Sequence, residues 1–184
     1  DVPEHWEVKR LKHIVSMKSG ESITSEDIEE SGDYPVYGGN GLRGYYSDYT
    51  HDGHYALIGR QGALCGNVNY GNGKFWASEH AVVAKPNRPT ATIWLGELLG
   101  IMDLNQYSVS AAQPGLAIDK IKELKVPTPS LPEQQAIATF LDHETGKIDV
   151  LIAKVEAAIV KLKEYRTALI SAAVTGKIDV REAA

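Results

Sequence analysis

Residues 130–176 read SLPEQQAIATFLDHETGKIDVLIAKVEAAIVKLKEYRTALISAAVTG, and this stretch decides the fold because it separates two parts of very different composition. Ser130 is followed three residues later by Glu133, with Pro132 inside the first turn, which is the pattern of a capping box at a helix N-terminus. The pattern predicts a helix that starts at this point and runs to about Asp142.

A longer helix is expected after a weak break at Thr145-Gly146, from about Lys147 to Thr175, with Gly176 as its C-terminal stop. Its apolar residues keep a 4-3-4-3 spacing that Arg166 interrupts, typical of a coiled-coil seam over about three heptads. The seam consists of Ile148, Ile152, Val155, Ile159, Leu162 and Leu169. At about 1.5 Å per residue this helix is about 43 Å long, too long to fold back on a compact domain. We expect a dimerising or partner-binding helix; an ordinary amphipathic core helix is the alternative.

The part before residue 130 is rich in Gly, Asn and Tyr and predicts short strands separated by tight turns. Strand candidates are Tyr34–Tyr37, Tyr45–Tyr46, His54–Ile58, Cys65–Tyr70 and Ala81–Ala84. Helical segments are expected at Ala91–Asn105 and Asp119–Leu124. The expected fold class is therefore α+β: a globular, β-rich domain over residues 1–129, followed by a long helical coiled-coil arm over residues 130–184.

The charge distribution argues mildly against a protein that binds DNA tightly on its own. The net charge of the 184 residues is −5, whereas nucleic-acid-binding proteins usually carry a basic excess. The acidic excess is confined to one short stretch, Glu21 to Asp33, which holds six carboxylates and no Lys or Arg. A small basic face elsewhere is still compatible with this composition.

The sequence shows neither a signal-peptide pattern nor an apolar run of membrane-spanning length. The single cysteine, Cys65, cannot form an internal disulfide, and a small buried apolar side chain is its simplest interpretation. These features predict a cytoplasmic protein without a membrane partner.

Motifs for catalysis are largely missing. Residues 39–44 match the pattern GxGxxG, but a nucleotide site needs a following helix and the sequence after Gly44 does not predict one. His51, His54 and His80 are imaginable as metal ligands, although a turn separates the first two. We therefore expect no catalytic residues, no metal site and no cofactor, and keep a metal enzyme as a minor alternative.

Polar side chains of the kind that read nucleic acid lie in or beside the Gly-rich turns. Arg bonds guanine through two hydrogen bonds, Asn and Gln do the same with adenine, and Lys holds phosphate. The residues expected to face DNA are Asn40, Arg43, Arg60, Gln61, Asn69, Lys74 and Gln113. For any one of them, a solvated loop residue is the simpler interpretation.

Several blocks closely resemble the specificity subunits of type I restriction-modification systems. Residues 113–116, 121–129 and 131–135 resemble the end of a target recognition domain in that family. Residues 137–141, 147–149 and 168–178 resemble its helical spacer, and residues 3–11 and 58–62 resemble other parts of the domain.

The resemblance implies a non-catalytic subunit that recognises double-stranded DNA. A full specificity subunit of this family has two recognition domains, each reading half of a bipartite target, and two long helical regions that pack antiparallel. These helices set the gap between the halves and dock methyltransferase subunits, to which restriction subunits are added. This sequence carries one domain and one helical region, so a homodimer is expected to supply the second helix. An oligomerisation or scaffold module that does not bind DNA is the main alternative.

Overall fold

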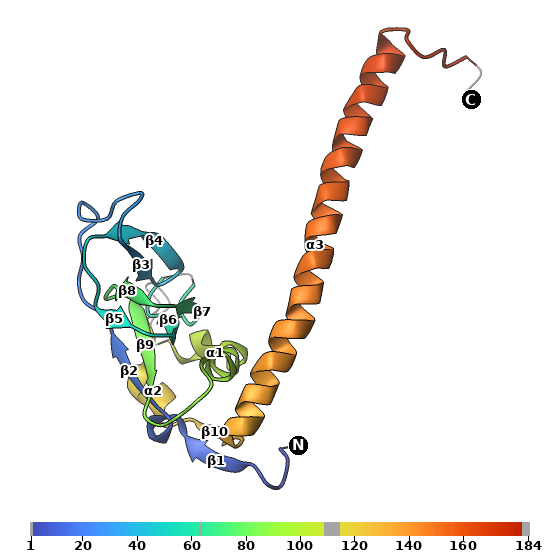
Figure 1. The fold of residues 1–184 in the computed structure, drawn as a ribbon. Helices are drawn as coiled ribbons and strands as arrows, with labels where there is room; N and C mark the ends of the chain where they lie inside the picture. The colour runs from blue at the N-terminus through green and yellow to red at the C-terminus, as the bar shows by residue number, and fades with distance from the viewer. Residues whose placement is uncertain (1, 63, 109–114, 182–184) are drawn as a thin grey trace. The chain divides into compact units, whose positions relative to one another are not determined.

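The computed structural model describes residues 2–62, 64–108 and 115–181 (Figure 1). Contacts divide the chain into two compact units, Asp1–Ala138 and Thr139–Ala184. The boundary between the units lies within the long C-terminal helix, because the first turns of that helix belong to the first unit. The expected fold class is confirmed: a β-rich domain precedes a long helix.

The first unit contains ten strands arranged in three sheets among its described residues. The strands are β1 (Glu7–Arg10), β2 (Val15–Ser19), β3 (Tyr34–Gly38), β4 (Gly41–Tyr46), β5 (His51–Asp52), β6 (Tyr55–Gly59), β7 (Val68–Gly71), β8 (Lys74–Ala77), β9 (Ala81–Pro86) and β10 (Lys125–Thr128). One four-stranded sheet has the order β2-β9-β6-β7, the other β4-β3-β8-β5, and β1 pairs with β10. All pairs are antiparallel except β3 with β8.

The sheet β2-β9-β6-β7 is covered on both faces, which explains the nearly continuous apolar runs of its central strands. Along β6, Ala56 and Ile58 pack into one hydrophobic cluster, whereas Leu57 packs into another on the opposite face. Alternation along a strand requires this division, because successive side chains point to opposite faces. The second cluster contains Phe75 and Ala77 of β8, so the two sheets pack against each other there.

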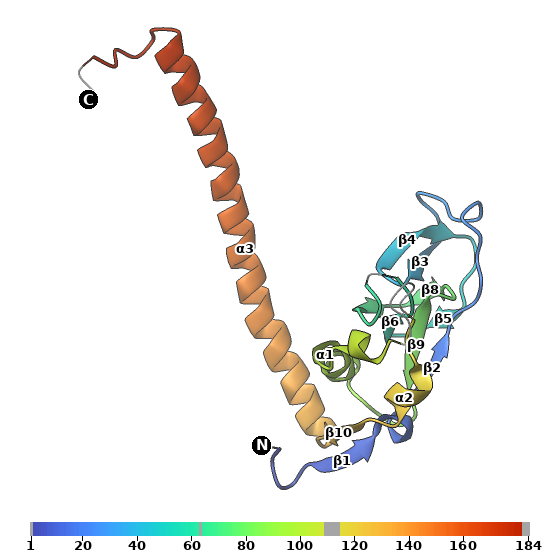
Figure 2. The same ribbon diagram turned by 180° about the vertical axis from the view of Figure 1, so that it is seen from behind.

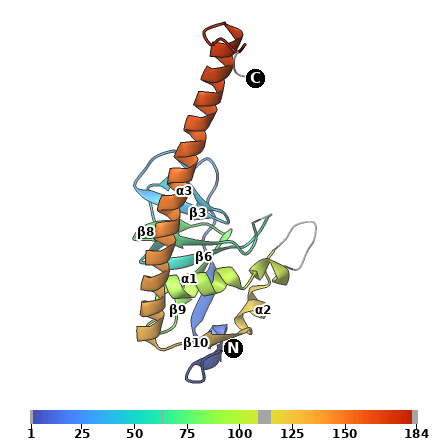
Figure 3. The same ribbon diagram turned by 90° about the vertical axis from the view of Figure 1, so that its right-hand side faces the viewer.

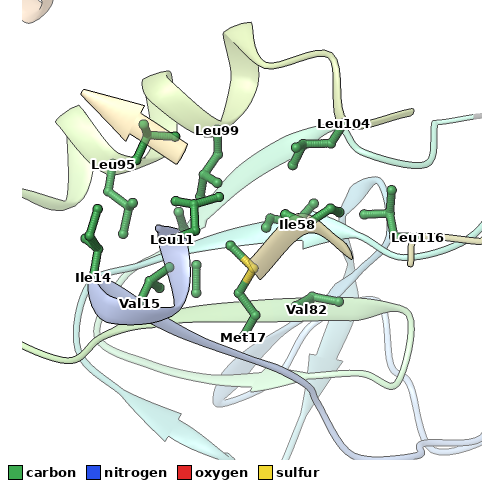
Figure 4. Packing of buried hydrophobic residues seen from close by; sticks show 14 of the residues in the cluster. Leu11, Ile14, Val15, Met17, Ile58, Val82, Leu95, Leu99, Leu104 and Leu116 are labelled. Atoms are coloured by element: carbon green, nitrogen blue, oxygen red, sulfur yellow. The ribbon is translucent and has the colours of Figure 1, made fainter. Parts of the chain in front are cut away.

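The larger cluster joins this sheet to α1 (Thr92–Ile101), which covers the face opposite the second sheet (Figures 2 and 3). Leu95 and Leu99 of α1 are fully buried against Ile58 and Val82 (Figure 4). The 3-10 helices η1 (Leu11–His13) and η2 (Leu104–Tyr107) and the short helix α2 (Ile118–Lys122) complete the cluster.

The structure corrects part of the predicted secondary structure. The expected helix over 91–105 ends earlier, at Ile101, and Asp103 after it has left-handed backbone with a φ of 46°. The expected strand over 65–70 forms only from Val68, as β7. Strands β1, β2, β5, β8 and β10 were not predicted, because each is short or holds few apolar residues.

The predicted break at Thr145-Gly146 is wrong, because α3 runs without interruption from Leu131 to Val174. The Thr145 hydroxyl donates to the carbonyl oxygen of Leu141 at 2.7 Å, so it bonds within the helix instead of competing with it. A glycine inside a helix costs about 1 kcal/mol, which the neighbouring turns offset. The helix has 44 residues and is about 66 Å long. Among the described helices, none combines the length and apolarity needed to cross a membrane.

The predicted C-terminal stop is confirmed. Gly176 has a φ of 72°, and its N–H donates to the carbonyl oxygen of Ala173 at 3.2 Å. The N–H of Lys177 donates to the carbonyl oxygen of Ala172 at 2.9 Å. These two bonds form a Schellman motif, which satisfies carbonyl groups left free at the end of a helix.

One half of the predicted capping box forms at the start of α3, where Glu133 reaches back to Ser130, and the same carboxylate also contacts residues outside the helix. Glu133 Oε2 accepts hydrogen bonds from the backbone N–H of Ser130 at 3.0 Å and from its hydroxyl at 2.6 Å. Glu133 Oε1 lies 2.6 Å from His5 Nε2 and accepts a hydrogen bond from Trp6 Nε1 at 3.1 Å. One carboxylate therefore caps the helix and holds the N-terminal segment to it.

Gln134, the next residue, is the one long polar side chain among the buried residues of the described chain, and it ties α3 to α1. Its Oε1 accepts a hydrogen bond from the N–H of Ala91, the residue that precedes α1, at 3.1 Å. Its Nε2 donates to the carbonyl oxygen of Pro129 at 3.0 Å. The buried amide thus satisfies backbone groups of two segments.

Glu133→Gln is expected to destabilise the fold most at neutral pH. The Ser130 hydroxyl, followed by His5, lowers the pKa of Glu133 to about 2 from an ordinary value of 4.5. Because the folded pKa is the lower one, this stabilisation is present above about 4.5 and is lost as the pH falls through about 2. Urea unfolding should show a difference between parent and variant that shrinks over this range.

Glu156→Gln is the matched control, since Glu156 is exposed on α3. It should change the free energy of unfolding little at any pH. A difference for Glu133→Gln that is equal in acid and at neutral pH would contradict the assignment of the effect to the charged carboxylate.

Candidate nucleic-acid interface

A concavity with a volume of about 620 Å³ forms where three connections of the first unit meet. It is lined by Gly39–Arg43 of the β3–β4 hairpin, by Gln61, Gly62 and Leu64 of the loop after β6, and by His80 of the turn between β8 and β9. Three of the residues expected to face DNA, Asn40, Arg43 and Gln61, are thereby brought together from positions about twenty residues apart.

Two glycines allow the hairpin and the loop to meet. A Cβ atom on Gly59 would lie 2.2 Å from the carbonyl oxygen of Gly39, closer than any side chain permits. The N–H of Arg60 donates to the carbonyl oxygen of His80 at 2.9 Å and fixes the loop beside the third connection. Gly41, with a φ of 90°, lies at the end of the hairpin turn, in a conformation that favours glycine.

Arg43 is positioned by a neighbouring glycine. A Cβ atom on Gly38 would lie 2.4 Å from Cδ of Arg43, so the aliphatic stem of the arginine lies across the bare backbone of β3. Arg43 itself is exposed. The guanidinium group is therefore available to a ligand while its stem is supported.

The asparagines have different surroundings. Asn40 is exposed at the hairpin tip, and its Oδ1 accepts a hydrogen bond of 3.4 Å from Asn67 Nδ2. Asn69 lies behind the hairpin, since a Cβ on Gly41 would be 3.1 Å from its Oδ1. Asn69 Nδ2 is buried without a hydrogen-bond partner in the described structure. Asn69 therefore lies against the hairpin and is not among the residues that line the concavity.

Arg60 and Lys74 do not line the concavity. Arg60 follows β6, but its Nη1 donates to Ser19 Oγ of β2 at 3.0 Å. Lys74 starts β8 and lies over the rings of Tyr49 and Tyr34, at 4.6 Å and 5.9 Å from their centroids. Since Tyr34 begins β3 and the concavity lies past its other end, Lys74 is about 13 Å or more away. Gln113 lies outside the described residues.

Hydrogen bonding to Tyr49 raises the pKa of Lys74, with the nearby Tyr34 adding to the effect. Lys74 therefore stays positively charged. It provides a separate basic point on the second sheet, of the kind that can bind an anion such as a phosphate.

The histidines considered as metal ligands have separate surroundings. The His51 ring is stacked on Phe75 with centroids 5.4 Å apart, and burial lowers its pKa. The His54 ring lies 5.8 Å from that of Tyr70, and His80 Nε2 is 3.2 Å from a carboxylate oxygen of Glu79. Across residues 2–62, 64–108 and 115–181, no three His, Cys, Asp or Glu side chains gather as metal ligands.

Two leucines of the concavity were missed by sequence reasoning. Leu42 and Leu64 line it with 55% and 50% of their surfaces exposed. Leu42 lies inside the GxGxxG match, which fails as a nucleotide motif because β4, not a helix, follows the turn. Both leucines stand beside glycine-rich turns in the sequence, but nothing in the local sequence distinguishes them from residues of the core.

Solved structures with similar folds belong to type I restriction-modification systems. The S subunit from M. genitalium is 20% identical, with a TM-score of 0.69 over 93% of this chain and 46% of that chain. The HsdS subunit from Thermoanaerobacter tengcongensis is 19% identical, with a TM-score of 0.66 over 97% of this chain and 47% of that chain. These similarities define the fold as that of a type I specificity subunit.

Residues 3–159 match the family described as the type I restriction modification DNA specificity domain, and this chain belongs to that family. The EcoprrI specificity subunit of Escherichia coli is 48% identical over 138 residues, which are 73% of this chain and 34% of that protein. The MpnII specificity subunit of Mycoplasma pneumoniae is 32% identical over 142 residues, 74% of this chain and 43% of that protein. The chain thus spans less than half of either relative.

Gly59→Ala is expected to disrupt the concavity, because the new methyl group would overlap the backbone of Gly39. Overpacking of this kind costs about 1–3 kcal/mol, and the hairpin can relieve it only by moving away from the loop. Thermal unfolding would measure the loss of stability. Gly100→Ala in α1 is the control, since no atom lies within 4 Å of its Cβ position. Equal melting temperatures for the two variants would contradict this packing argument.

Proposed function

We propose that this chain is a DNA-reading component of a type I restriction-modification system, with the concavity between the β3–β4 hairpin and the loop after β6 as its base-reading surface. It reads one half of a bipartite target and is itself non-catalytic, so that methylation and cleavage belong to other subunits. Its compartment would be that of its substrate DNA, the cytoplasm. The observation that carries the proposal is the family match over residues 3–159.

The chemistry of the concavity supports this proposal. An arginine and two amide side chains are exposed at the concavity: Arg43 near the start of β4, Asn40 in the hairpin turn and Gln61 in the loop after β6. Arginine pairs with O6 and N7 of guanine, and amides pair with N6 and N7 of adenine, each through two hydrogen bonds. A two-stranded ribbon such as β3–β4 also has the dimensions that enter a major groove.

Arg43→Ala and Gln61→Ala are expected to weaken binding to the target but not to unrelated DNA. Methylome sequencing of the host with and without this gene would first give the target sequence. In complex with the methyltransferase subunits, loss of a two-bond base contact should cost about 1–3 kcal/mol on that sequence only. Affinities for target and scrambled duplexes at a fixed salt concentration would measure this.

Lys74→Ala is the matched control on the second sheet. Because a phosphate contact carries no sequence information, the variant should bind all DNA more weakly by a similar factor or bind like the parent. If Arg43→Ala and Gln61→Ala both leave target affinity unchanged, the reading surface lies elsewhere. If the parent complex retains no DNA in a salt-dependent way, a scaffold module is the better description.

The apolar stripe of α3 supports a second part of the proposal, pairing of two copies. Every predicted seam residue is at least 45% exposed, from Ile159 and Leu169 at 45% to Leu162 at 66%. Leu151 and Tyr165, 61% and 66% exposed, flank the seam on one side. The apolar face of α3 is therefore wider than the seam of a two-stranded coiled coil. The additional apolar surface is available to a methyltransferase subunit beside the partner helix. Restriction subunits would join indirectly.

Replacing Val155 and Ile159 together with Asp is expected to dissociate the proposed antiparallel homodimer. Both residues lie at the centre of the seam, and unpaired charges buried in an interface are costly. Arg166 weakens the packing near the end of the seam, so the centre should matter most. Light scattering at several concentrations would compare the variant with the parent. Lys154→Gln with Lys161→Gln, both at exposed positions, changes the net charge by the same two units and would control for the added charge.

A two-fold homodimer would present two identical reading surfaces, so its target would be two inverted copies of one half-site separated by a fixed gap. A parent chain that stays monomeric well above micromolar concentration would remove the pairing and the inverted target with it. It would not affect base reading by the concavity.

A further inference from the structure

We infer that Leu42 and Leu64 are specificity-determining residues that contact the C5-methyl group of thymine, so that the half-site read by this chain contains at least one A·T pair recognised through that methyl. The inference rests on the proposed function and adds a base identity to it. It starts from the composition of the concavity, which brings two half-exposed leucines together with the polar residues proposed to read bases.

The two leucines come from different segments of the chain and line the same concavity. Leu42 is the second residue of β4, at the hairpin tip, and Leu64 lies on the loop after β6. The hairpin and the loop are held together by the close approach of Gly39 and Gly59. The apolar surface is therefore formed jointly by two backbone segments and not by a single side chain.

The chemistry of DNA leaves few partners for such a surface. Phosphates are charged, and the edges of guanine, cytosine and adenine are distinguished in the major groove by their hydrogen-bond donors and acceptors. Thymine alone among the four bases adds an apolar group there, its C5-methyl, and that group is absent from the minor groove. A leucine that meets base edges through the major groove is thus matched to thymine.

The polar neighbours of the leucines fit the same base pair. Gln61 lies three residues before Leu64 and Asn40 two residues before Leu42. An amide bonds N6 and N7 of adenine, whose partner is thymine. An amide and a leucine on one connection therefore suit the two bases of an A·T pair, whereas a G·C pair would leave the leucine against polar groups.

Uracil tests the inference without any protein variant, because it differs from thymine only in lacking the methyl group. Each thymine of the target half-site is replaced in turn by deoxyuridine, and the affinity of the parent complex with the methyltransferase subunits is measured. Removal of one buried methyl should weaken binding about fourfold at one or more positions. Equal affinities at every position, with sequence-specific binding retained, would overturn the inference but leave the proposed function intact.

Leu42→Ala and Leu64→Ala identify the residue responsible. The variant that removes the contact should bind the thymine duplex about as weakly as the parent binds the uracil duplex, so that its ratio of the two affinities falls to about one. Ile101→Ala is the matched control, since Ile101 is 80% exposed on α1 and does not line the concavity, and it should keep the parent ratio. Melting temperatures would show that all three variants are folded.

Two further outcomes separate the alternatives. If both leucine variants keep the parent ratio but lose affinity for the methyltransferase subunit, the leucines form a protein interface and the inference is wrong. If the parent complex shows no sequence-specific binding at all, the proposed function fails and the inference fails with it.

Discussion

The arrangement of the first unit depends on the polar contacts at the start of α3. There, one carboxylate, Glu133, accepts hydrogen bonds from Ser130 and Trp6 and contacts His5, while the buried amide of Gln134 bonds the backbone at Ala91 and Pro129. The first strand pairs with β10 immediately beside this point. The two ends of the domain and the start of α1 are thus held together by hydrogen bonds. Apolar contacts alone would not fix this arrangement, because hydrogen bonds specify both the partner and the geometry.

The surface proposed to read bases depends on a different part of the same unit. It combines the loop after β6 and the turn before β9, which connect strands of the sheet packed on both faces, with the β3–β4 hairpin of the second sheet. Glycines at 38, 39 and 59 let these segments approach closely, and the bare backbone at Gly38 supports the stem of the exposed Arg43. Glycine matters here mainly for close backbone approach, with positive φ required at Gly41.

Sequence reasoning succeeded where a local pattern determines the structure. The capping pattern and Gly176 predicted both ends of α3. The break predicted at Thr145-Gly146 does not form, because the free-energy cost of a single glycine is smaller than the stabilisation from the intact helical turns around it. Sequence reasoning identified polar residues beside the glycine turns, but it could not show that Arg43 and Gln61 line one concavity while Lys74 lies elsewhere. The parallel pairing of β3 with β8, which places Lys74 at the far end of the sheet, is a long-range contact.

Under the proposed function, the charge of the chain fits a division of labour between affinity and discrimination. Affinity for any DNA comes mainly from neutralising phosphates, and a chain with a net charge of −5 contributes little of it. Discrimination comes from base contacts, each of which separates right from wrong bases by about 1–3 kcal/mol whatever the source of the overall affinity. A subunit that reads bases can therefore remain weakly charged, provided that its partners hold the phosphates. The exposed apolar stripe on α3 is where such partners would be recruited, and it shares no residue with the concavity. Because the two surfaces are separate in sequence, substitutions at the hairpin tip can alter the bases that are read without changing the face that assembles the complex.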